Sequence, residues 1–190
     1  MTRVAVLISG RGSNMQALVE QARGYEVVLV ASDNPEAPGL AWAAAHGIPT
    51  FALSPRGIGK AAMEAAFLDQ FRAHDVDLVA LAGYMRLVSP AFIAAMKGAI
   101  LNIHPSLLPL YKGLDTHARA LAAGDREAGC SVHLVTEELD GGRVLAQSRV
   151  PIQPGDTPET LAARVLNAEH ALYPAAVATY CAAQASAPSS

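Results

Sequence analysis

The chain opens with an uninterrupted apolar run at residues 3–9 (RVAVLIS), and a glycine-rich turn and a helical pattern follow it directly. A strand with one face in water alternates apolar and polar residues, whereas a strand buried on both faces reads as a continuous apolar run. The opening run therefore predicts a central strand of a parallel sheet. The helix predicted at residues 15–22 would cross over this sheet, which is the first step of an α/β fold.

The same step recurs along the chain. Apolar runs at residues 26–31, 49–52, 77–82 and 99–103 predict further strands. Helical patterns occur at residues 39–46, 60–74, 116–124 and 157–182, and Ser89 and Pro90 are expected to cap one more helix. Residues 129–136 and 143–150 alternate as strands around an Asp-Gly-Gly turn, which favours a hairpin because positive φ is easily reached there. We therefore expect a three-layer α/β/α fold with a mostly parallel central sheet, a Rossmann-like N-terminal half and an antiparallel edge hairpin.

Length and composition narrow the class of protein further. The 190 residues suit one domain, residues 1–184, with a disordered tail at residues 185–190, and Pro174 is expected to kink or divide the last helix. A net charge of −3 argues against a nucleic-acid or anionic-membrane surface, and no segment has the ~18–20 apolar residues of a membrane span. The two cysteines give neither a disulfide framework nor metal-ligand spacing. Without a signal-peptide pattern, the chain is expected to be cytoplasmic.

The turn at residues 10–14 (GRGSN) joins the first strand to the first helix. Backbone N–H groups at a helix N-terminus bind anions, so Gly12, Ser13 and Asn14 are candidate phosphate-binding residues. Ser13 or Asn14 is expected to cap the helix. The alternative is a tight turn that needs glycine for its geometry alone.

The strand at residues 99–103 leads into His104 and Pro105. Side chains alternate along a strand, so Asn102 and His104 face the same way, about 6–7 Å apart along its axis. Pro105 ends the strand ladder because it has no N–H to donate. A neutral amide and a titratable imidazole therefore stand side by side at the carboxyl end of a strand, where open α/β sheets bind ligands.

Other candidate residues have two interpretations each. Asp140 either serves only to form the hairpin turn or places its carboxylate to pair with His104. The loop at residues 83–88 follows a buried strand and is a natural pocket wall, whose backbone could pair with a flat heterocycle. Taken alone, Lys60 is a solvated side chain and Glu169 a surface residue in mid-helix.

These features together resemble the phosphoribosylglycinamide (GAR) formyltransferases, folate-dependent enzymes of the formyltransferase superfamily. The matching stretches lie between residues 3 and about 180 and read ISGRGSN (8–14), LAGYMR (81–86), LNIHPSLLP (101–109), LDGG (139–142) and ARVLNAEHALYP (163–174). The Asn-x-His-Pro-Ser-Leu-Leu-Pro stretch is specific to the superfamily. The opening Ser-Gly-x-Gly-Ser-Asn narrows the resemblance to the GAR enzymes.

The resemblance implies transfer of a formyl group from the co-substrate 10-formyltetrahydrofolate to the amine of GAR, giving N-formyl-GAR and tetrahydrofolate in de novo purine biosynthesis. It implies that Asn102, His104 and Asp140 are catalytic. The residues that it implies for GAR are Gly12, Ser13, Asn14, Met85, Leu166, Asn167, Ala168 and Glu169. Those that it implies for the folate are Lys60, Met85, Arg86, Leu87, Val88, Asn102, Thr136, Glu137, Glu138, Leu139 and Asp140.

The chemistry of the implied reaction explains these residue types. Attack by the amine on the formyl carbon builds negative charge on the formyl oxygen, which an N–H of Asn102 and a protonated His104 would stabilise. Asp140 would hold His104 and favour its protonated form. Lys60 stands where the family commonly has an arginine, so it keeps the charge but not the bidentate fork. No metal, nucleic acid or membrane is implied, and the expected assembly is a monomer or homodimer.

Several alternatives stay open. Methionyl-tRNA formyltransferase carries an additional C-terminal domain and formyltetrahydrofolate deformylase an extra N-terminal one, and neither is expected here. An NAD(P)-dependent oxidoreductase would use Gly10, Gly12 and Asp33, but Met15 stands where the dinucleotide fingerprint needs Gly or Ala. A ligand-sensing domain would bind without turnover. The sequence also leaves open whether the Leu108–Pro109 bond is cis and whether residues 137–142 form a lid.

Overall fold

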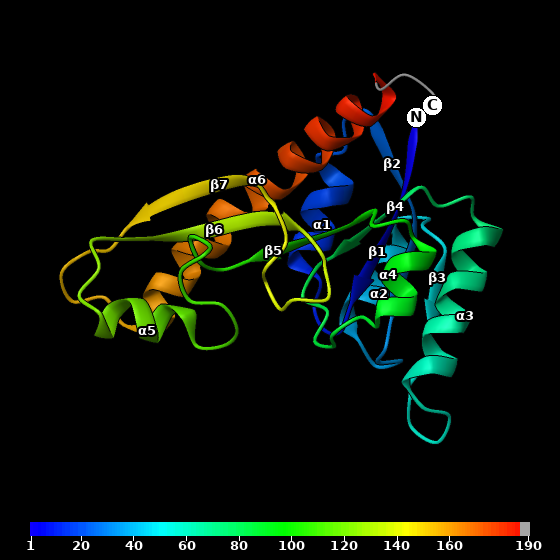
Figure 1. Cartoon of the computed structure of the whole chain (residues 1–190), viewed down its shortest axis with the longest axis horizontal. Coiled ribbons are helices and arrows are strands. Elements are labelled where there is room, and N and C mark those ends of the chain that lie inside the picture. Colours follow the sequence, from blue (N-terminus) through cyan, green and yellow to red (C-terminus); the bar gives the residue numbers. More distant parts are fainter. Residues whose placement is uncertain (187–190) are drawn as a thin grey trace.

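The computed structural model describes residues 1–186, which form a seven-stranded sheet with helices on both faces (Figure 1). The strands are β1 (Thr2–Ile8), β2 (Tyr25–Ser32), β3 (Thr50–Ala52), β4 (Leu78–Leu81), β5 (Ile100–His104), β6 (Glu127–Leu134) and β7 (Val144–Pro151). The helices are α1 (Ser13–Glu20), α2 (Pro38–Ala45), α3 (Lys60–Ala73), α4 (Pro90–Ala95), α5 (Thr116–Ala122) and α6 (Pro158–Ala185). The α/β class predicted from the alternating apolar runs is confirmed. Residues 187–190 of the expected tail lie outside the described residues.

The strand order is β3-β2-β1-β4-β5-β6-β7. Neighbours from β3 to β5 pair in parallel. Strands β6 and β7 pair antiparallel, as predicted for the edge hairpin, and β6 also pairs antiparallel with β5. The chain moves outward from β1 to β3 and then returns to place β4 on the other side of β1. This reversal makes a switch point between β1 and β4, and ligands of open α/β sheets bind beside the carboxyl ends of such strands.

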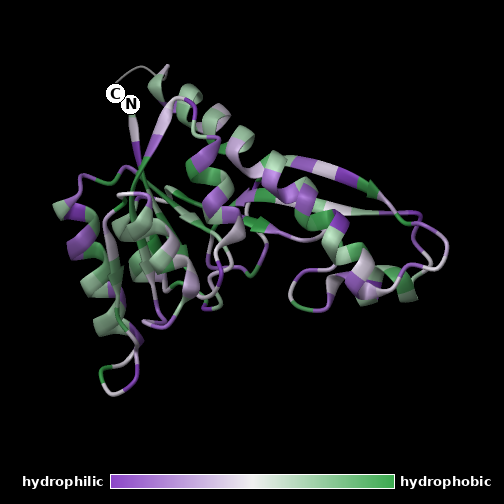
Figure 2. Ribbon diagram, turned by 180° about the vertical axis from the view of Figure 1, so that it is seen from behind, coloured by the Kyte–Doolittle hydropathy of each residue, from purple (hydrophilic) through white to green (hydrophobic). Residues whose placement is uncertain are grey.

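Alternate residues of the central strands serve two hydrophobic cores. In β1, Val4, Val6 and Ile8 join the core with α1, α2 and α6. Ala5 and Leu7 join the opposite core with α3 and α4. Both sets are fully buried, which is the physical reason that this strand reads as a continuous apolar run. Strand β7 at the edge of the sheet instead carries hydrophilic bands along its length (Figure 2).

Helix α6 lies along the sheet and continues through Pro174 (Figure 1). Of the two effects expected of this proline, a kink or a division, the division does not occur. Its Tyr173 side chain is fully buried and anchors the helix to the strands. The Tyr173 hydroxyl lies 2.9 Å from the carbonyl oxygen of Leu81 in β4 and 3.1 Å from that of Leu101 in β5. These contacts hold the helix to the sheet at the residue before the proline, whose own N–H is missing from the helical ladder.

Candidate active site

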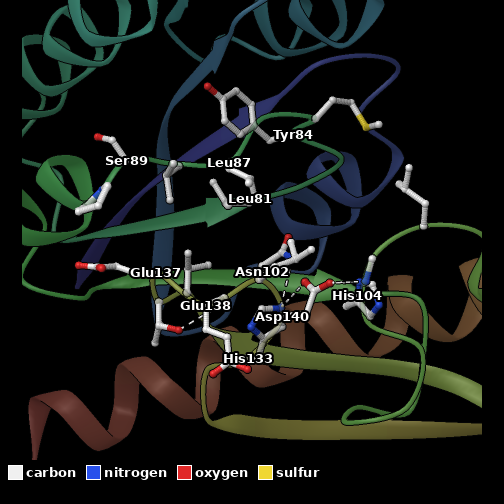
Figure 3. A pocket seen from close by; sticks show the side chains of 18 of the residues that line it. Leu81, Tyr84, Leu87, Ser89, Asn102, His104, His133, Glu137, Glu138 and Asp140 are labelled. Carbon is white, nitrogen blue, oxygen red and sulfur yellow. Dashed lines mark hydrogen bonds and ion pairs between the residues drawn. The ribbon is translucent and has the colours of Figure 1, made fainter.

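A cavity of about 470 Å³ lies over β5 and β6, beside the loop that follows β4 (Figure 3). The predicted residues that line it are Lys60, Met85, Leu87, Val88, Asn102, His104, Thr136, Glu137, Glu138, Leu139 and Asp140. The other lining residues are Leu81, Tyr84, Ser89, Pro90, Gly113, Leu114, His133 and Val135. The fold therefore brings the three candidate catalytic residues and all but one of the candidate folate residues to a single cavity.

The strand register explains why polar side chains meet there. Leu101 and Ile103 of β5 pack into the core beneath α6, so Asn102 and His104 project from the opposite face of the sheet. The antiparallel pairing of β5 with β6 sets His133 directly opposite Asn102. Nδ2 of Asn102 lies 3.2 Å from Nε2 of His133. Two adjacent strands thus present an amide and two imidazoles to the cavity.

Asp140 reaches the same place from the loop between β6 and β7. Its Oδ2 lies 3.4 Å from Nδ1 of His104 and accepts a 2.9 Å hydrogen bond from the N–H of Gly113. Nε2 of His104 lies 2.9 Å from the carbonyl oxygen of Tyr111. Both ring nitrogens of His104 therefore face oxygen atoms, Nε2 within hydrogen-bond distance and Nδ1 within ion-pair distance. The pairing of Asp140 with His104 was one of the two interpretations of this carboxylate.

The turn that carries Asp140 differs from the prediction in one respect. Positive φ occurs at Asp140 itself (φ 50°) and at neither of the two glycines that follow it. The glycines are needed for close approach instead. A Cβ on Gly142 would lie 1.8 Å from the carbonyl oxygen of Leu134, and one on Gly141 would meet the Glu138 side chain at 2.3 Å. The Asp-Gly-Gly sequence thus packs the loop tightly against β6.

His133 was not singled out from the sequence, although it contributes to the site. It is buried, and this burial lowers the pKa of its imidazole despite the nearby carboxylate of Asp140. Nδ1 lies 2.9 Å from the carbonyl oxygen of Leu134, so the neutral ring donates there and leaves Nε2 as an acceptor for Asn102. This bond orients the Asn102 amide and leaves its second N–H available to a ligand in the cavity. The sequence signal for His133 was the alternation of residues 129–136, which places residues 131 and 133 on the same face of the strand.

The rim of the cavity is apolar and exposed. Met85, Leu87, Leu114 and Leu139 are 74%, 64%, 76% and 49% exposed and all line the cavity. Large apolar side chains gathered in water around a concave polar site mark a ligand-binding surface. The rim therefore fits a partly aromatic or aliphatic ligand whose reacting end lies at the polar floor.

A hydrogen-bond network holds the loop at residues 83–88, which forms one wall of the cavity. The Ser9 hydroxyl donates to Oδ1 of Asp33 at 2.6 Å and accepts from the N–H of Met85 at 3.0 Å. Nε of Arg86 donates to Oδ2 of Asp33 at 2.6 Å. Arg86 is the candidate folate residue that does not line the cavity, because its guanidinium turns toward Asp33.

A second polar cluster lies where α1 meets α6. Gly12 with φ 71° is the N-cap of α1, and no side chain caps this end, so the predicted cap at Ser13 or Asn14 is wrong. The left-handed backbone at Gly12 makes Ser13 and Asn14 the first helical residues, which leaves their N–H groups as free donors. Nδ2 of Asn14 donates to Oε2 of Glu169 at 3.0 Å, whereas Oδ1 of Asn14 is buried without a partner among the described residues.

Glu169 is 7% exposed, so its interpretation as a surface residue is wrong. Its burial raises the pKa of its carboxyl against the opposing hydrogen bond from Asn14. Of the other candidate GAR residues, Leu166 and Ala168 are half-buried and Asn167 is exposed on the same helix, outside the cavity. The candidate GAR residues thus divide between this cluster and Met85 at the cavity rim.

Within residues 1–186, no cluster of three or more His, Cys, Asp or Glu side chains has the arrangement of a metal centre. Within the same residues, no helix combines the length and apolar character needed to cross a membrane.

Comparison with known proteins decides the family. Residues 2–177 match the model of a family that is described as "Formyl transferase". This chain belongs to the formyl transferase family.

Relatives of this formyl transferase share its sequence and its fold. The structure of phosphoribosylglycinamide formyltransferase from Brucella melitensis is 54% identical, with a TM-score of 0.91 over 95% of this chain and 96% of that chain. Phosphoribosylglycinamide formyltransferase from Escherichia coli (strain K12) is 42% identical over 182 residues, 93% of this chain and 86% of that protein. The trifunctional purine biosynthetic protein adenosine-3 of Drosophila melanogaster is 43% identical over 183 residues. The match covers 93% of this chain and 14% of that protein's length.

Membership of the formyl transferase family disfavours the oxidoreductase alternative, and the geometry agrees. A dinucleotide-binding protein needs a carboxylate that is free to hold a ribose. Here Asp33 is 7% exposed, and both of its oxygens are engaged by Ser9 and Arg86. In this formyl transferase, Asp33 holds the loop at residues 83–88 in place through Ser9 and Arg86. The Leu108–Pro109 peptide bond, left open by the sequence, is cis.

Proposed function

We propose that this formyl transferase carries the formyl group of 10-formyltetrahydrofolate to the amine of GAR, giving N-formyl-GAR and tetrahydrofolate in de novo purine biosynthesis. The observation that carries the proposal is the convergence of Asn102, His104 and Asp140 on one cavity, with Nδ1 of His104 3.4 Å from Asp140. The names and the 42–54% identity of the bacterial relatives support GAR as the acceptor.

The cavity suits the folate donor. Its floor is polar and its rim is apolar, which fits a flat heterocycle joined to an aromatic spacer. The backbones of residues 85–88 and 136–140 offer N–H and C=O groups to the heterocycle on two sides. Lys60 at the edge of the cavity is exposed and would meet the anionic end of the folate as a point charge.

The cluster between α1 and α6 suits the acceptor. The uncapped N–H groups at Gly12, Ser13 and Asn14 point from a helix N-terminus, where a phosphate is stabilised by hydrogen bonds and by the helix dipole. Glu169 and Oδ1 of Asn14, which has no partner within residues 1–186, offer acceptors for the ribose hydroxyls or the amide of GAR. The amine would then lie between this cluster and the cavity floor.

The catalytic residues act on charge that develops during transfer. The amine nitrogen of GAR attacks the formyl carbon, and the formyl oxygen gains negative charge that Asn102 N–H and the His104 imidazolium stabilise. One such donor lowers a barrier by about 3–4 kcal/mol. The bond from the formyl carbon to N10 of the folate then breaks, the attacking nitrogen loses a proton and N10 gains one. His104 and Asp140, in contact at 3.4 Å, are suited to move that proton, directly or through water.

The proposal is tested with purified protein, 10-formyltetrahydrofolate and GAR, followed by absorbance of the released folate and by the mass of the acceptor product. We expect release only when GAR is present and a product that carries one added formyl group. Glycinamide without the ribose phosphate serves as the control acceptor and should react poorly, because it cannot use the α1 cluster. Release without any acceptor would identify a deformylase instead, and a folded protein without release would support a ligand-sensing domain.

A further inference from the structure

The segment between β5 and α5 supplies two backbone groups to the catalytic pair. The carbonyl oxygen of Tyr111 accepts from Nε2 of His104, and the N–H of Gly113 donates to Oδ2 of Asp140, each at 2.9 Å. The backbone there is unusual, because Tyr111 (φ 52°) and Asp115 (φ 56°) are left-handed without being glycine. Such a conformation costs free energy and persists only where surrounding contacts hold it.

Arg119, in the last turn of α5, makes these contacts. Its Nη1 donates to the carbonyl oxygen of Lys112 at 2.7 Å and to that of Leu114 at 3.1 Å. Its guanidinium carbon also lies 5.2 Å from the centre of the Tyr111 ring, within the range of a cation–π contact. One guanidinium therefore holds the segment at three residues, Tyr111, Lys112 and Leu114, which lie on either side of Gly113.

The bond to Lys112 matters most, because of the peptide geometry. The carbonyl of Lys112 and the N–H of Gly113 belong to one planar trans peptide, so they point in opposite directions and turn together. Arg119 holds the oxygen end of this peptide, and Asp140 accepts from its N–H end. A rotation of the peptide that broke the first bond would also misdirect the second. A charged donor on the carbonyl further polarises the N–H toward the carboxylate.

We propose that Arg119 is a positioning residue for formyl transfer, which acts on Asp140 through the Lys112–Gly113 peptide and on His104 through Tyr111. The proposal rests on the proposed function for its activity test, but not for its structural test. Arg119 does not line the cavity, so it acts without touching either substrate. Both hydrogen bonds come from Nη1, while the guanidinium carbon lies over the Tyr111 ring. A lysine ammonium has N–H donors for the two carbonyls but no planar group to lie against the ring.

Other charged groups near Asp140 must be kept constant in any test. Asp140 faces His104 from β5 and His133 from β6, at 3.4 and 3.6 Å. Lys112 pairs through Nζ with Glu138 at 2.9 Å, which links the same two loops by their side chains. Arg119 contacts the carbonyl of Lys112 and leaves this ion pair free to remain in place.

The test compares Arg119→Met, which keeps the aliphatic stem, with Arg119→Lys, which keeps the charge. Arg126→Met is the matched control, because Arg126 is exposed in the turn after α5 and its loss changes the net charge equally. In Arg119→Met we expect kcat to fall about 10- to 100-fold, the cost of slightly misplaced catalytic groups, with KM for both substrates within about twofold. Arg119→Lys should be intermediate, and Arg126→Met should match the wild type.

Thermal unfolding separates positioning from a loss of folded protein. The kcat of Arg119→Met should stay low at temperatures well below its unfolding transition, where a merely destabilised variant would be folded. A kcat within twofold of the wild type would overturn the proposal.

Amide hydrogen exchange gives a readout that needs no substrate. The Gly113 N–H is protected by Asp140 in the wild type, and we expect its exchange to be at least tenfold faster in Arg119→Met and unchanged in Arg126→Met. Equal exchange in the wild type and Arg119→Met would overturn the proposal even if the enzyme acts on GAR. If the wild type fails to act on GAR, the proposed function fails, and the exchange result still decides the role of Arg119.

Discussion

Replacement of Asp140 by asparagine isolates the charge of one carboxylate from its shape. Asparagine is nearly isosteric, and its Oδ1 can still accept from the N–H of Gly113, which lies 2.9 Å from the carboxylate in the native chain. The change removes the negative charge that faces Nδ1 of His104 at 3.4 Å. The loop and the cavity should therefore stay in place while the imidazolium loses its counter-charge.

The distance between the Asp140 carboxylate and the His104 ring gives the size of the expected effect on kcat. Two unit charges 3.4 Å apart interact by about 5 kcal/mol at an effective dielectric of about 20. If about half of that interaction energy is gained only on reaching the transition state, the barrier of Asp140→Asn is higher by about 2.5 kcal/mol. This lowers kcat roughly 100-fold, because each 1.36 kcal/mol is about a factor of ten. KM for the folate should stay within about threefold, since the shape of the cavity is kept.

Steady-state formyl transfer at saturating GAR and 10-formyltetrahydrofolate measures this effect. Asp69→Asn on α3 is the control, because Asp69 is exposed and pairs only with Arg72 among the described residues. Thermal unfolding of each variant checks that the fold is kept. A kcat for Asp140→Asn within fivefold of the wild type would refute the electrostatic role given to this carboxylate.

Three further variants test other parts of the account. Burial raises the pKa of Glu169, so the folded state keeps this proton to a higher pH than the unfolded chain, and stability is lost as pH rises above about 4.3. In Glu169→Gln, Tm should therefore depend less on pH and turnover should fall, and an unchanged Tm–pH curve would contradict this. Tyr173→Phe leaves two buried carbonyls without their donor and should cost about 1–3 kcal/mol in chemical denaturation without changing KM. Lys60→Met should raise KM for the folate at most about fivefold, because an exposed ion pair contributes at most about 1 kcal/mol, and a large drop in kcat would argue against a rim role.

Much of the fold was predictable from the sequence, because burial on both faces of a strand leaves a direct trace. The apolar run at residues 3–9 became β1, and the two alternating segments around Asp140 became the antiparallel edge pair. The prediction that Asn102 and His104 share a face followed from strand geometry alone and agrees with the register. Local rules of this kind need no knowledge of partners distant in the sequence.

The remaining features depend on tertiary partners. Arg86 was placed with the folate residues by resemblance, but the direction of its side chain is set by Asp33, 53 residues away. Glu169 has the sequence context of a surface helix residue and is buried because α1 packs over it and Asn14 binds it. Nothing local distinguishes Arg119 from another solvated helix arginine. Its contacts exist only because Tyr111 and its neighbours fold back toward α5.

We propose that His104 carries the chemistry in the cavity over β5 and β6, and the decisive measurement is turnover by His104→Ala. We predict that kcat for GAR-dependent release of tetrahydrofolate falls about 1,000-fold or more, because the variant loses both a donor to the oxyanion and the proton carrier. The Kd for the folate, measured separately, should change by less than about fivefold, since one small side chain leaves a preformed cavity. A folded His104→Ala protein with kcat within tenfold of the wild type would contradict the account.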